Sequence, residues 1–310
     1  MDPERCTARV HDTVVEADTL PRLRQALGDR LYEVLHAGMD LGHKLRPRTL
    51  GDPPFQRLLA EAVPHGTTVL EIPADRLGDP TGDDERRATL DGVRVLVPAG
   101  AVDEEAVAPD GTGAVRAVLR LPAGRPSLSP GFYLVDGSAG RPRGSDLVRH
   151  YVHIQEAEEA PAVWNRVLTA LEDSGVSYRA KVASSRLLYS RRDALVVYMD
   201  AHDVPRVDLA AVADRLPGIG EATSVFAARV APGVATACEP SDPRPGMARL
   251  SFGQHRARAV ADGLVEHAQN PTGGTAEEAV CRCLAAAGAR PDAPWRNAEG
   301  TGPGPSPAQE

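Results

Sequence analysis

Residues 149–182 have the sequence RHYVHIQEAEEAPAVWNRVLTALEDSGVSYRAKV, in which one helical pattern lies between two alternating ones. Between residues 158 and 173, apolar side chains recur every three or four positions, which predicts a helix with a single buried face. The segments on either side alternate apolar and polar residues, which predicts strands. This strand–helix–strand unit is the part of the chain from which the rest of the fold can be inferred.

Alternation also assigns each side chain of the two strands to a face, because successive residues of a strand point to opposite sides. In residues 149–154 and 176–182 the apolar members point one way and the polar members the other. If the two strands join one sheet, His153 and Lys181 line one cleft. The polar faces carry Arg149, Tyr151 and His153 on the first strand and Arg179 and Lys181 on the second.

Further strands and helices are predicted along the chain, and their order indicates an α+β fold. Strand patterns do not alternate regularly with helices, and no glycine-rich phosphate loop follows a strand, which argues against a doubly wound nucleotide-binding sheet. We therefore expect a mixed sheet flanked by helices. The additional strands are expected at residues 114–121, 131–137, 193–200 and 223–231, and the additional helices at residues 20–40, 251–268 and 275–288.

Composition divides the chain into three parts. Residues 1–112 contain turn-rich segments such as GDPP and GDPTGDDERR around short apolar runs, which predicts a helical and irregular region, a candidate for docking a peptide or partner. Residues 113–290 hold most of the predicted strands and helices and form the expected core domain. Residues 291–310 are rich in proline and glycine and are expected to be a disordered tail.

Composition also narrows the functional classes. A net charge of -8 at pH 7 argues against a general nucleic-acid or membrane-surface binder, because such proteins carry a basic excess. The four cysteines lack the spacing of a disulfide framework, a zinc site or a redox motif. The first ten residues lack the apolar segment of a signal peptide, and no stretch is long and apolar enough to span a membrane. We expect a cytoplasmic protein with reduced cysteines.

The positive charge of the chain comes almost entirely from arginine, since its 35 lysines and arginines include only two lysines. One of them is Lys181. Lysine can lose its proton and act as a base, whereas arginine stays charged and binds oxyanions with a planar fork. Arg191 lies two residues before Asp193 in the chain, and Arg249 and Arg256 lie near a predicted helix start, which also favours an anion. Together they indicate a phosphate site; a structural histidine, surface ion pairs and a solvated arginine face are the alternatives.

Four segments, in this order, resemble the HopA-type effector family. They are GFYLVDG (131–137), RHYVHI (149–154), VSYRAKV with YSRRDALVVY (176–198), and FAARVAPGVATACEP with SFGQHRARAVADGL (226–264). The family includes effectors of plant pathogens and the stand-alone lyases of class V lanthipeptide and thioamide-peptide biosynthesis. It is similar in turn to the phosphothreonine lyases of animal pathogens.

The resemblance implies a lyase that eliminates phosphate from phosphoserine or phosphothreonine, leaving dehydroalanine or dehydrobutyrine, with no metal or organic cofactor. By the matching motifs, Lys181 is the base and His153 the acid, and Arg191 and Arg256 bind the phosphate. Tyr151 stands where the animal-pathogen enzymes have a lysine. The sequence pattern and the resemblance together predict the residues that bind the phosphate and the rest of the substrate. They are Arg149, Tyr151, Arg179, Arg191, Tyr198, Arg249 and Arg256.

The implied chemistry explains why a lysine is needed. A lysine must be neutral before it can remove a Cα proton, and desolvation with neighbouring cations can lower a lysine pKa from about 10.4 to roughly 7–8, whereas arginine remains charged. The implied partners are a phosphorylated precursor peptide, a separate Ser/Thr kinase and a cyclase. A phosphohydrolase is the alternative among enzymes. The alternative from another class is a non-catalytic, effector-like protein that binds a phosphopeptide or a partner.

Overall fold

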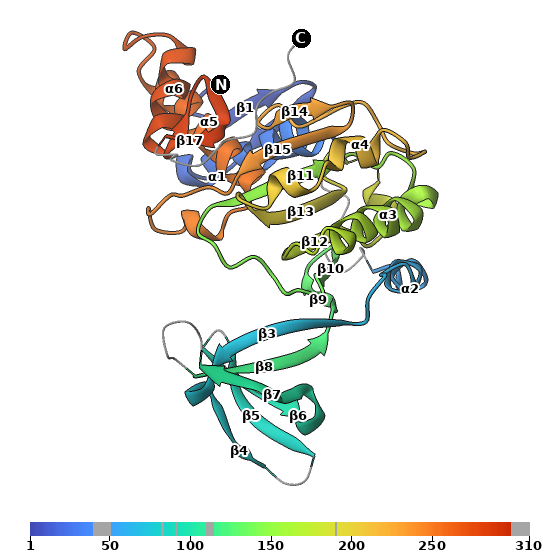
Figure 1. Cartoon of the computed structure of the whole chain (residues 1–310). Helices are drawn as coiled ribbons and strands as arrows, with labels where there is room; N and C mark the ends of the chain where they lie inside the picture. Colours follow the sequence, from blue (N-terminus) through green and yellow to red (C-terminus); the bar gives the residue numbers. More distant parts are fainter. Residues whose placement is uncertain (40–50, 82–83, 91, 110–114, 190, 299–310) are drawn as a thin grey trace.

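A seven-stranded sheet forms the centre of the protein, with the strand order β14-β15-β11-β13-β12-β10-β9 (Figure 1). The computed structural model describes residues 1–39, 51–81, 84–90, 92–109, 115–189 and 191–298. All pairings within the sheet are antiparallel, and the expected α+β class is confirmed. The strands are β9 (Gly124–Ser129), β10 (Phe132–Asp136), β11 (Leu147–Val152), β12 (Tyr178–Ala183), β13 (Leu195–Asp200), β14 (Ala228–Ala231) and β15 (Val234–Cys238).

One face of the sheet is covered by α2 (Pro53–Glu61), α3 (Ala160–Asp173) and α4 (Leu209–Ala213). The apolar side of α3 is the one that the sequence predicts, and Trp164, Leu168 and Leu171 are completely buried there. The apolar faces of β11 and β12 pack against them. This larger core holds the strand–helix–strand unit of residues 149–182 together.

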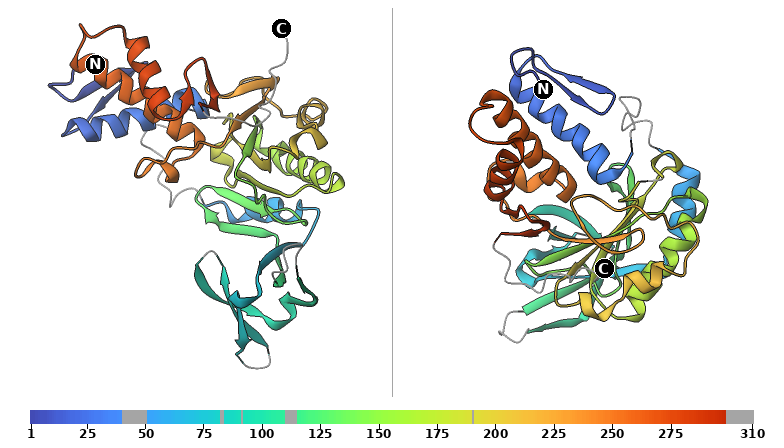
Figure 2. Two further views of the ribbon diagram at one scale, coloured as in Figure 1. Left: turned by 60° about the vertical axis from the view of Figure 1, so that its left-hand side comes forward. Right: turned by 90° about the horizontal axis from the view of Figure 1, so that it is seen from above.

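The opposite face is covered by α1 (Leu20–Leu31), a π-helix called η1 (Tyr32–Ala37) that continues it, and α5 (Phe252–Gln269). Figure 2 shows these helices and the α3 layer on opposite sides of the sheet. The π-helix η1 is followed by Gly38, whose φ of 71° is a left-handed conformation that favours glycine. The hairpin of β1 (Thr7–Val10) and β2 (Thr13–Glu16) packs on α1, and α6 (Ala276–Ala286) packs on α5.

The region expected to be helical and irregular instead contains two three-stranded antiparallel sheets, which we call the β3–β8 lobe (Figure 1). The expected boundary near residue 112 also fails, because β8 lies beyond it and pairs with β3 and β7. Short strands interrupted by turns hid the alternation from the sequence analysis. The lobe consists of β3 (Thr67–Pro73), β4 (Leu77–Pro80), β5 (Glu85–Leu90), β6 (Val93–Pro98), β7 (Val102–Pro109) and β8 (Val115–Pro122).

The expected disordered tail begins later than residue 291. The hairpin of β16 (Ala289–Arg290) and β17 (Ala293–Asn297) follows α6, and Trp295 packs against the core on the α5 side of the sheet. Tertiary contacts therefore order a segment whose composition is typical of disorder. Residues 299–310 lie outside the described part of the chain.

Two further expectations concern the whole chain. Within the described ranges, no helix has the length and apolar character needed to cross a membrane. The four cysteines form no disulfide with one another.

Candidate active site

Sheet register brings the polar residues of three strands onto one face. Lys181 of β12 pairs with Val196 of β13, which pairs on its other side with Tyr151 of β11. Residues paired directly across antiparallel strands point to the same face. Two residues further along β13, Tyr198 pairs with Arg149 of β11 on one side and with Arg179 of β12 on the other. All of these side chains therefore share the face that carries α1, η1 and α5.

The amine of Lys181 is held by aromatic rings. Its Nζ lies 4.4 Å from the ring centroid of Phe132 and 5.9 Å from that of Tyr198, distances typical of cation–π contacts. The side chain is half-buried, and no hydrogen bond or ion pair joins it to another described residue. The amine is thus positioned by ring contacts, with the Asp193 carboxylate near enough for an electrostatic interaction but not for an ion pair.

Arg191 belongs to a buried network with Asp193 and Tyr32 of η1. Its Nε and Nη2 donate to the two carboxylate oxygens of Asp193 at 2.7 and 2.8 Å, and Nη2 also donates to the Tyr32 hydroxyl at 2.7 Å. The Tyr32 hydroxyl donates to Asp193 at 3.1 Å. Burial alone would raise the pKa of Asp193, but Arg191, together with His36 and Lys181, outweighs burial and holds that pKa well below its usual range. Asp193 is therefore an anion that fixes the guanidinium.

The ring of Phe132 contacts both Lys181 and Arg191. The guanidinium carbon of Arg191 lies 5.4 Å from the Phe132 centroid. Arg149 forms a second anchored guanidinium, which is bound by Glu239 through Nε and Nη2 and lies 4.9 Å from the Tyr198 centroid. Within the described residues, Nη1 of each arginine has no hydrogen-bond partner in the protein. Both guanidiniums thus keep one donor group for an anionic ligand.

His36 of η1 lies at this site although the sequence analysis did not single it out. Its Nδ1 is 2.7 Å from the Ser224 hydroxyl, and its Nε2 is 3.7 Å from Asp193. Burial, reinforced by the nearby arginines and Lys181 and opposed by Asp193, lowers the pKa of His36 to about 4. The ring is therefore neutral at pH 7. Tyr32 was not predicted as a site residue either, although it lies with His36 in the segment LYEVLHAG (31–38), and Asp193 was considered only as the neighbour of Arg191 in the chain.

Tyr151 brings a polar atom into the site without a partner. Its ring contacts that of His36 edge-on, with centroids 5.1 Å apart, and the side chain is almost completely buried. Its hydroxyl has no hydrogen-bond partner among the described residues. Burial raises the pKa of this hydroxyl far above its usual value, so Tyr151 remains a neutral donor.

His153 lies just beyond the strand that carries Tyr151. The pairing of β11 with β13 ends at Val152, and the His153 backbone N–H donates to the Gly233 carbonyl at 2.8 Å. Its ring packs against Gly220, where an added Cβ would lie 2.3 Å from the ring. His153 therefore borders the polar face at the end of β11, one residue past the strand, and is not directly across the sheet from Lys181.

Arg256 is fully buried and lies behind the site, with its guanidinium carbon 5.0 Å from the ring centroid of Phe252, a ring that also contacts Tyr151. Its Nε donates to the Pro294 carbonyl at 2.6 Å, Nη1 is 2.7 Å from Nδ1 of His255, and Nη2 donates to Asn297 at 3.1 Å. Burial lowers the pKa of Arg256 to about 10. These contacts hold the β16–β17 hairpin against α5, which is a structural role that the sequence could not reveal.

The helix start predicted to attract an anion is occupied by the protein itself. Ser251 and Gln254 form a capping box that satisfies backbone N–H groups at the first turn of α5. Arg249 is exposed at the end of η9 (Met247–Arg249) and makes no described contact. Arg179 instead lies on the same strand as Lys181 and binds Asp136 through two hydrogen bonds of 2.6 and 3.0 Å.

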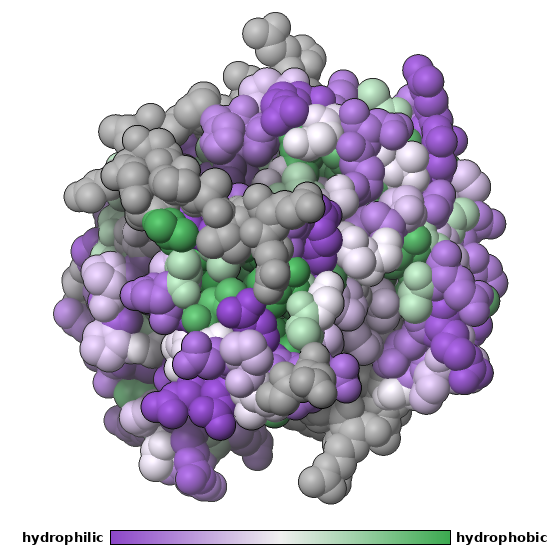
Figure 3. Space-filling view, turned by 60° about the horizontal axis from the view of Figure 1, so that its bottom comes forward, coloured by the Kyte–Doolittle hydropathy of each residue, from purple (hydrophilic) through white to green (hydrophobic). Residues whose placement is uncertain are grey.

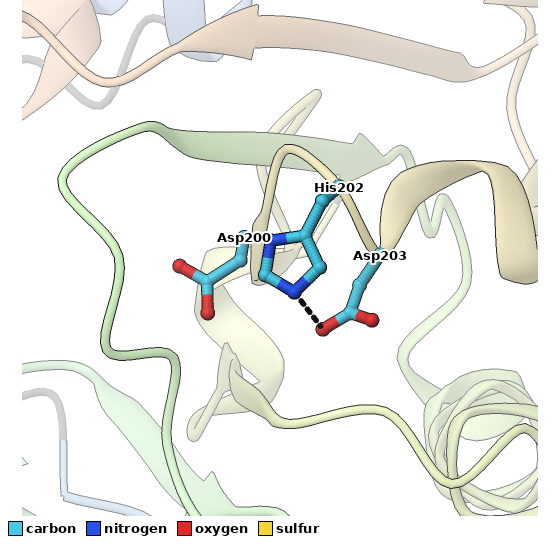
Figure 4. A group of neighbouring side chains, drawn as sticks. All are labelled: Asp200, His202 and Asp203. Carbon is cyan, nitrogen blue, oxygen red and sulfur yellow. Dashed lines mark ion pairs between the residues drawn. The ribbon is translucent and has the colours of Figure 1, made fainter. Parts of the chain in front are cut away.

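A group of possible metal ligands, Asp200, His202 and Asp203, lies at the opposite end of β13 from Asp193 (Figure 4). The Asp200 carboxylate already accepts hydrogen bonds from the backbone N–H groups of Arg143 and Gly144. Asp203 accepts from Arg206, and His202 is exposed. These carboxylates hold the loops around them, so their arrangement is explained without a metal.

Comparisons with known proteins give one family and two structures of similar fold. The model of the HopA1 effector protein family matches residues 123–296. The structure of the effector protein from Pseudomonas syringae pv. tomato strain DC3000 superposes with a TM-score of 0.50 at 15% identity, over 88% of this chain and 90% of that chain. The effector protein from Pseudomonas syringae pv. syringae strain 61 gives 0.47 at 12% identity, over 88% and 95%. No curated protein matches the sequence.

Proposed function

The chain belongs to the HopA1 effector protein family, and from that premise we propose that it is a phosphoserine/phosphothreonine lyase acting on a phosphorylated precursor peptide. The observation that carries the proposal is the position of Lys181, whose amine lies over Phe132 beside Arg191 and has no carboxylate partner among the described residues. A site that only bound phosphate would need the arginines and not this lysine.

The proposed reaction is a β-elimination. Neutral Lys181 removes the Cα proton, the electron pair of that C–H bond forms the Cα=Cβ double bond, and the Cβ–O bond to phosphate breaks. The products are dehydroalanine or dehydrobutyrine in the peptide, inorganic phosphate and a protonated lysine. The lysine proton then passes to solvent.

The phosphate is proposed to bind between Arg149 and Arg191. Each guanidinium is oriented by a carboxylate on one edge and retains Nη1 for a phosphate oxygen, and a pre-oriented fork binds an oxyanion with little loss of side-chain freedom. The unpartnered hydroxyl of Tyr151 supplies a further donor for a phosphate or carbonyl oxygen. The ring of Tyr198 contacts both Arg149 and Lys181 and so joins the phosphate site to the base.

His153 is the proposed proton donor to the departing phosphate. The other candidates on this face are less suitable: His36 is neutral at pH 7 because its pKa is about 4, and burial raises the pKa of the Tyr151 phenol. Histidine is the side chain most often used for proton transfer, and His153 borders this face at the end of β11. His36 is assigned to holding Tyr151 and Asp193 in place.

The proposed reaction requires two neighbouring activities. A kinase must phosphorylate the serine or threonine before elimination, and the electrophilic double bond that results is consumed by addition of a nucleophile such as a cysteine thiol, as in a lanthipeptide-type ring. Both are proposed here as separate proteins.

The test is the mass of a synthetic phosphothreonine or phosphoserine peptide after incubation with the protein in EDTA, with Lys181→Ala in parallel. Elimination removes the elements of phosphoric acid from the peptide, and we expect this loss with the unmodified chain and not with the variant. Loss of phosphate that leaves a hydroxyl would identify a phosphohydrolase. An unchanged peptide that nevertheless binds would identify a non-catalytic phosphopeptide-binding protein.

A further inference from the structure

A cavity of about 190 Å³ lies where the β3–β8 lobe meets the edge of the central sheet. Its apolar wall includes Leu70 of β3, Leu121 of β8 and Leu128 of β9, and its polar wall includes Arg125 and Arg179. Leu128 is 60% exposed, so its side chain is accessible to a ligand. Figure 3 views the protein from the end occupied by the lobe and shows hydrophobic side chains surrounded by hydrophilic ones on this face.

The cavity carries an excess of positive charge. Arg125, Arg141 and Arg179 line it together with a single carboxylate, that of Asp136. Arg179 binds Asp136 through two hydrogen bonds, and Nε of Arg125 lies 3.8 Å from the same carboxylate. One carboxylate cannot neutralise both guanidiniums that it contacts, so this site favours an anionic ligand within a chain whose net charge is -8.

The cavity and the candidate active site share one strand, β12. Arg179 precedes Lys181 by two residues on β12, and the two side chains point to the same face. Two residues of a strand span about 7 Å. An extended peptide with its phosphorylated residue at Lys181 would therefore reach the cavity within roughly two to four residues, at about 3.3–3.6 Å per residue.

The edge of the sheet at the cavity favours recognition of side chains over addition of a strand. β9 is the last strand of the central sheet, and such edges can pair with an extended peptide. Pro126 in the middle of β9 has no N–H to donate, which weakens that mode of binding. The leucine wall and the guanidiniums remain as the means of recognition.

We propose that this cavity binds the substrate peptide on one side of the phosphorylated residue, with an apolar side chain against Leu70, Leu121 and Leu128 and an acidic or second phosphorylated residue at Arg125. This inference rests on the proposed lyase function, because it takes the substrate peptide as the occupant. A peptide carrying several phosphates is strongly anionic, which complements the charge of the cavity. The lobe thereby gains a role in substrate selection.

The test uses a peptide library with a fixed central phosphoserine and all other positions randomised. The library is incubated with the unmodified chain, and the eliminated peptides are sequenced by mass spectrometry. We expect enrichment of Leu, Ile, Met or Phe and of Asp or Glu at positions two to four residues from the phosphoserine, on one side only. Leu128→Glu should abolish the apolar preference, and Arg125→Glu should exchange the acidic preference for a basic one.

Leu187→Glu is the matched control, because Leu187 is 59% exposed and does not line the cavity. Elimination without any positional preference, or preferences unaffected by Leu128→Glu and Arg125→Glu, would overturn the inference while leaving the lyase function intact. The library is also equilibrated with the Lys181→Ala chain and the bound peptides are identified. The same enrichment there, without elimination by the unmodified chain, would contradict the lyase function but support the cavity as a peptide site.

Discussion

Phe132 is the residue around which the candidate active site is arranged, since the amine of Lys181 and the guanidinium of Arg191 both lie over its ring. The ring attracts both cations and keeps their charges close to one another without supplying a carboxylate to the amine. Nearby cations favour the neutral form of an amine. The proposed base, Lys181, and the proposed phosphate-binding Arg191 can therefore both be positioned by the ring of Phe132.

At this scale the first prediction concerns Lys181→Arg, which keeps the positive charge but cannot become a neutral base. We expect the elimination rate to fall at least about a hundredfold, the lower range for loss of a general base. The rate is measured as the initial loss of phosphoric acid from a phosphothreonine peptide. Binding of the same peptide, followed by fluorescence anisotropy, should be nearly unchanged. A variant with full activity would contradict the assignment of Lys181.

The second prediction concerns the proton donor. His153→Gln should lower the elimination rate about a hundredfold, and Tyr151→Phe about tenfold, the cost of one hydrogen bond of roughly 1.4 kcal/mol in the transition state. If Tyr151→Phe is inactive and His153→Gln is active, the phenol is the donor instead.

The position of the His153 ring can be tested independently through Gly220. An alanine Cβ there would lie 2.3 Å from the ring, so Gly220→Ala must displace it. We expect this variant to lose activity as His153→Gln does. Gly66→Ala is the control, because its Cβ would meet nothing within 4 Å.

At the scale of elements, η1 is joined to the sheet by buried polar contacts. Tyr32 and His36 reach Asp193 from a helix that is distant in the chain, and His36 also binds Ser224. A π-helix offers side chains in a spacing that an α-helix does not, and such segments are frequent at functional sites. The site is thus built from a sheet face and the end of one helix.

The third prediction follows from this connection. Asp193→Ala would leave Arg191 buried and uncompensated, so the free energy of unfolding should fall by about 3–5 kcal/mol. Urea unfolding followed by circular dichroism measures the change. Arg290→Ala removes an exposed ion pair with Asp292 and should leave the unfolding transition nearly unchanged. Equal effects of the two substitutions would mean that the Asp193 network does not anchor η1.

The fourth prediction separates a structural role of Arg256 from phosphate binding. Arg256→Gln leaves buried acceptors of the β16–β17 hairpin unpaired, and we expect a loss of about 1–3 kcal/mol in the free energy of unfolding. The KM for a phosphopeptide, measured where the variant is folded, should remain within about twofold of the original. A KM raised tenfold at unchanged stability would restore Arg256 as a phosphate ligand, as the resemblance implied.

For the molecule as a whole, buried histidines set the response of stability to pH. Burial lowers the pKa of His36 and of His150 to about 4, whereas an unfolded histidine titrates near about 6.5. Between these values the unfolded chain binds protons that the folded protein does not. The unfolding free energy therefore decreases as the pH falls through this range.

The fifth prediction gives this effect a magnitude. Each of the two histidines should lower the unfolding free energy by up to about 1.4 kcal/mol per pH unit between roughly pH 6 and pH 4. Urea unfolding at several pH values measures the slope, and His150→Gln should remove about half of it. His202→Gln, at a side chain that is 77% exposed, should leave it unchanged. A slope that His150→Gln does not alter would contradict the buried neutral state.

The whole molecule also shows how far the sequence alone could lead. Periodicity assigned the faces of β11 and β12 and the buried side of α3 correctly, and it placed Arg149, Tyr151, Arg179 and Lys181 on one side of the sheet. It failed for the β3–β8 lobe, whose short strands are interrupted by turns, and for β17, whose order depends on packing against α5. The catalytic roles of the site residues remain predictions.

The amino-acid sequence by itself determined the central strands, the helix between them and the lysine on their polar face, because alternation and helical spacing are local and are set by burial of one face. The tertiary structure alone decided which distant side chains complete the site. Tyr32 meets Asp193 across 161 positions of the chain and His36 meets Ser224 across 188, and no local pattern encodes such pairs. The tertiary structure also decided that every guanidinium nitrogen of Arg256 has a hydrogen-bond partner, whereas Nη1 of Arg191 has no partner among the described residues. Such differences depend on the folded surroundings of each side chain.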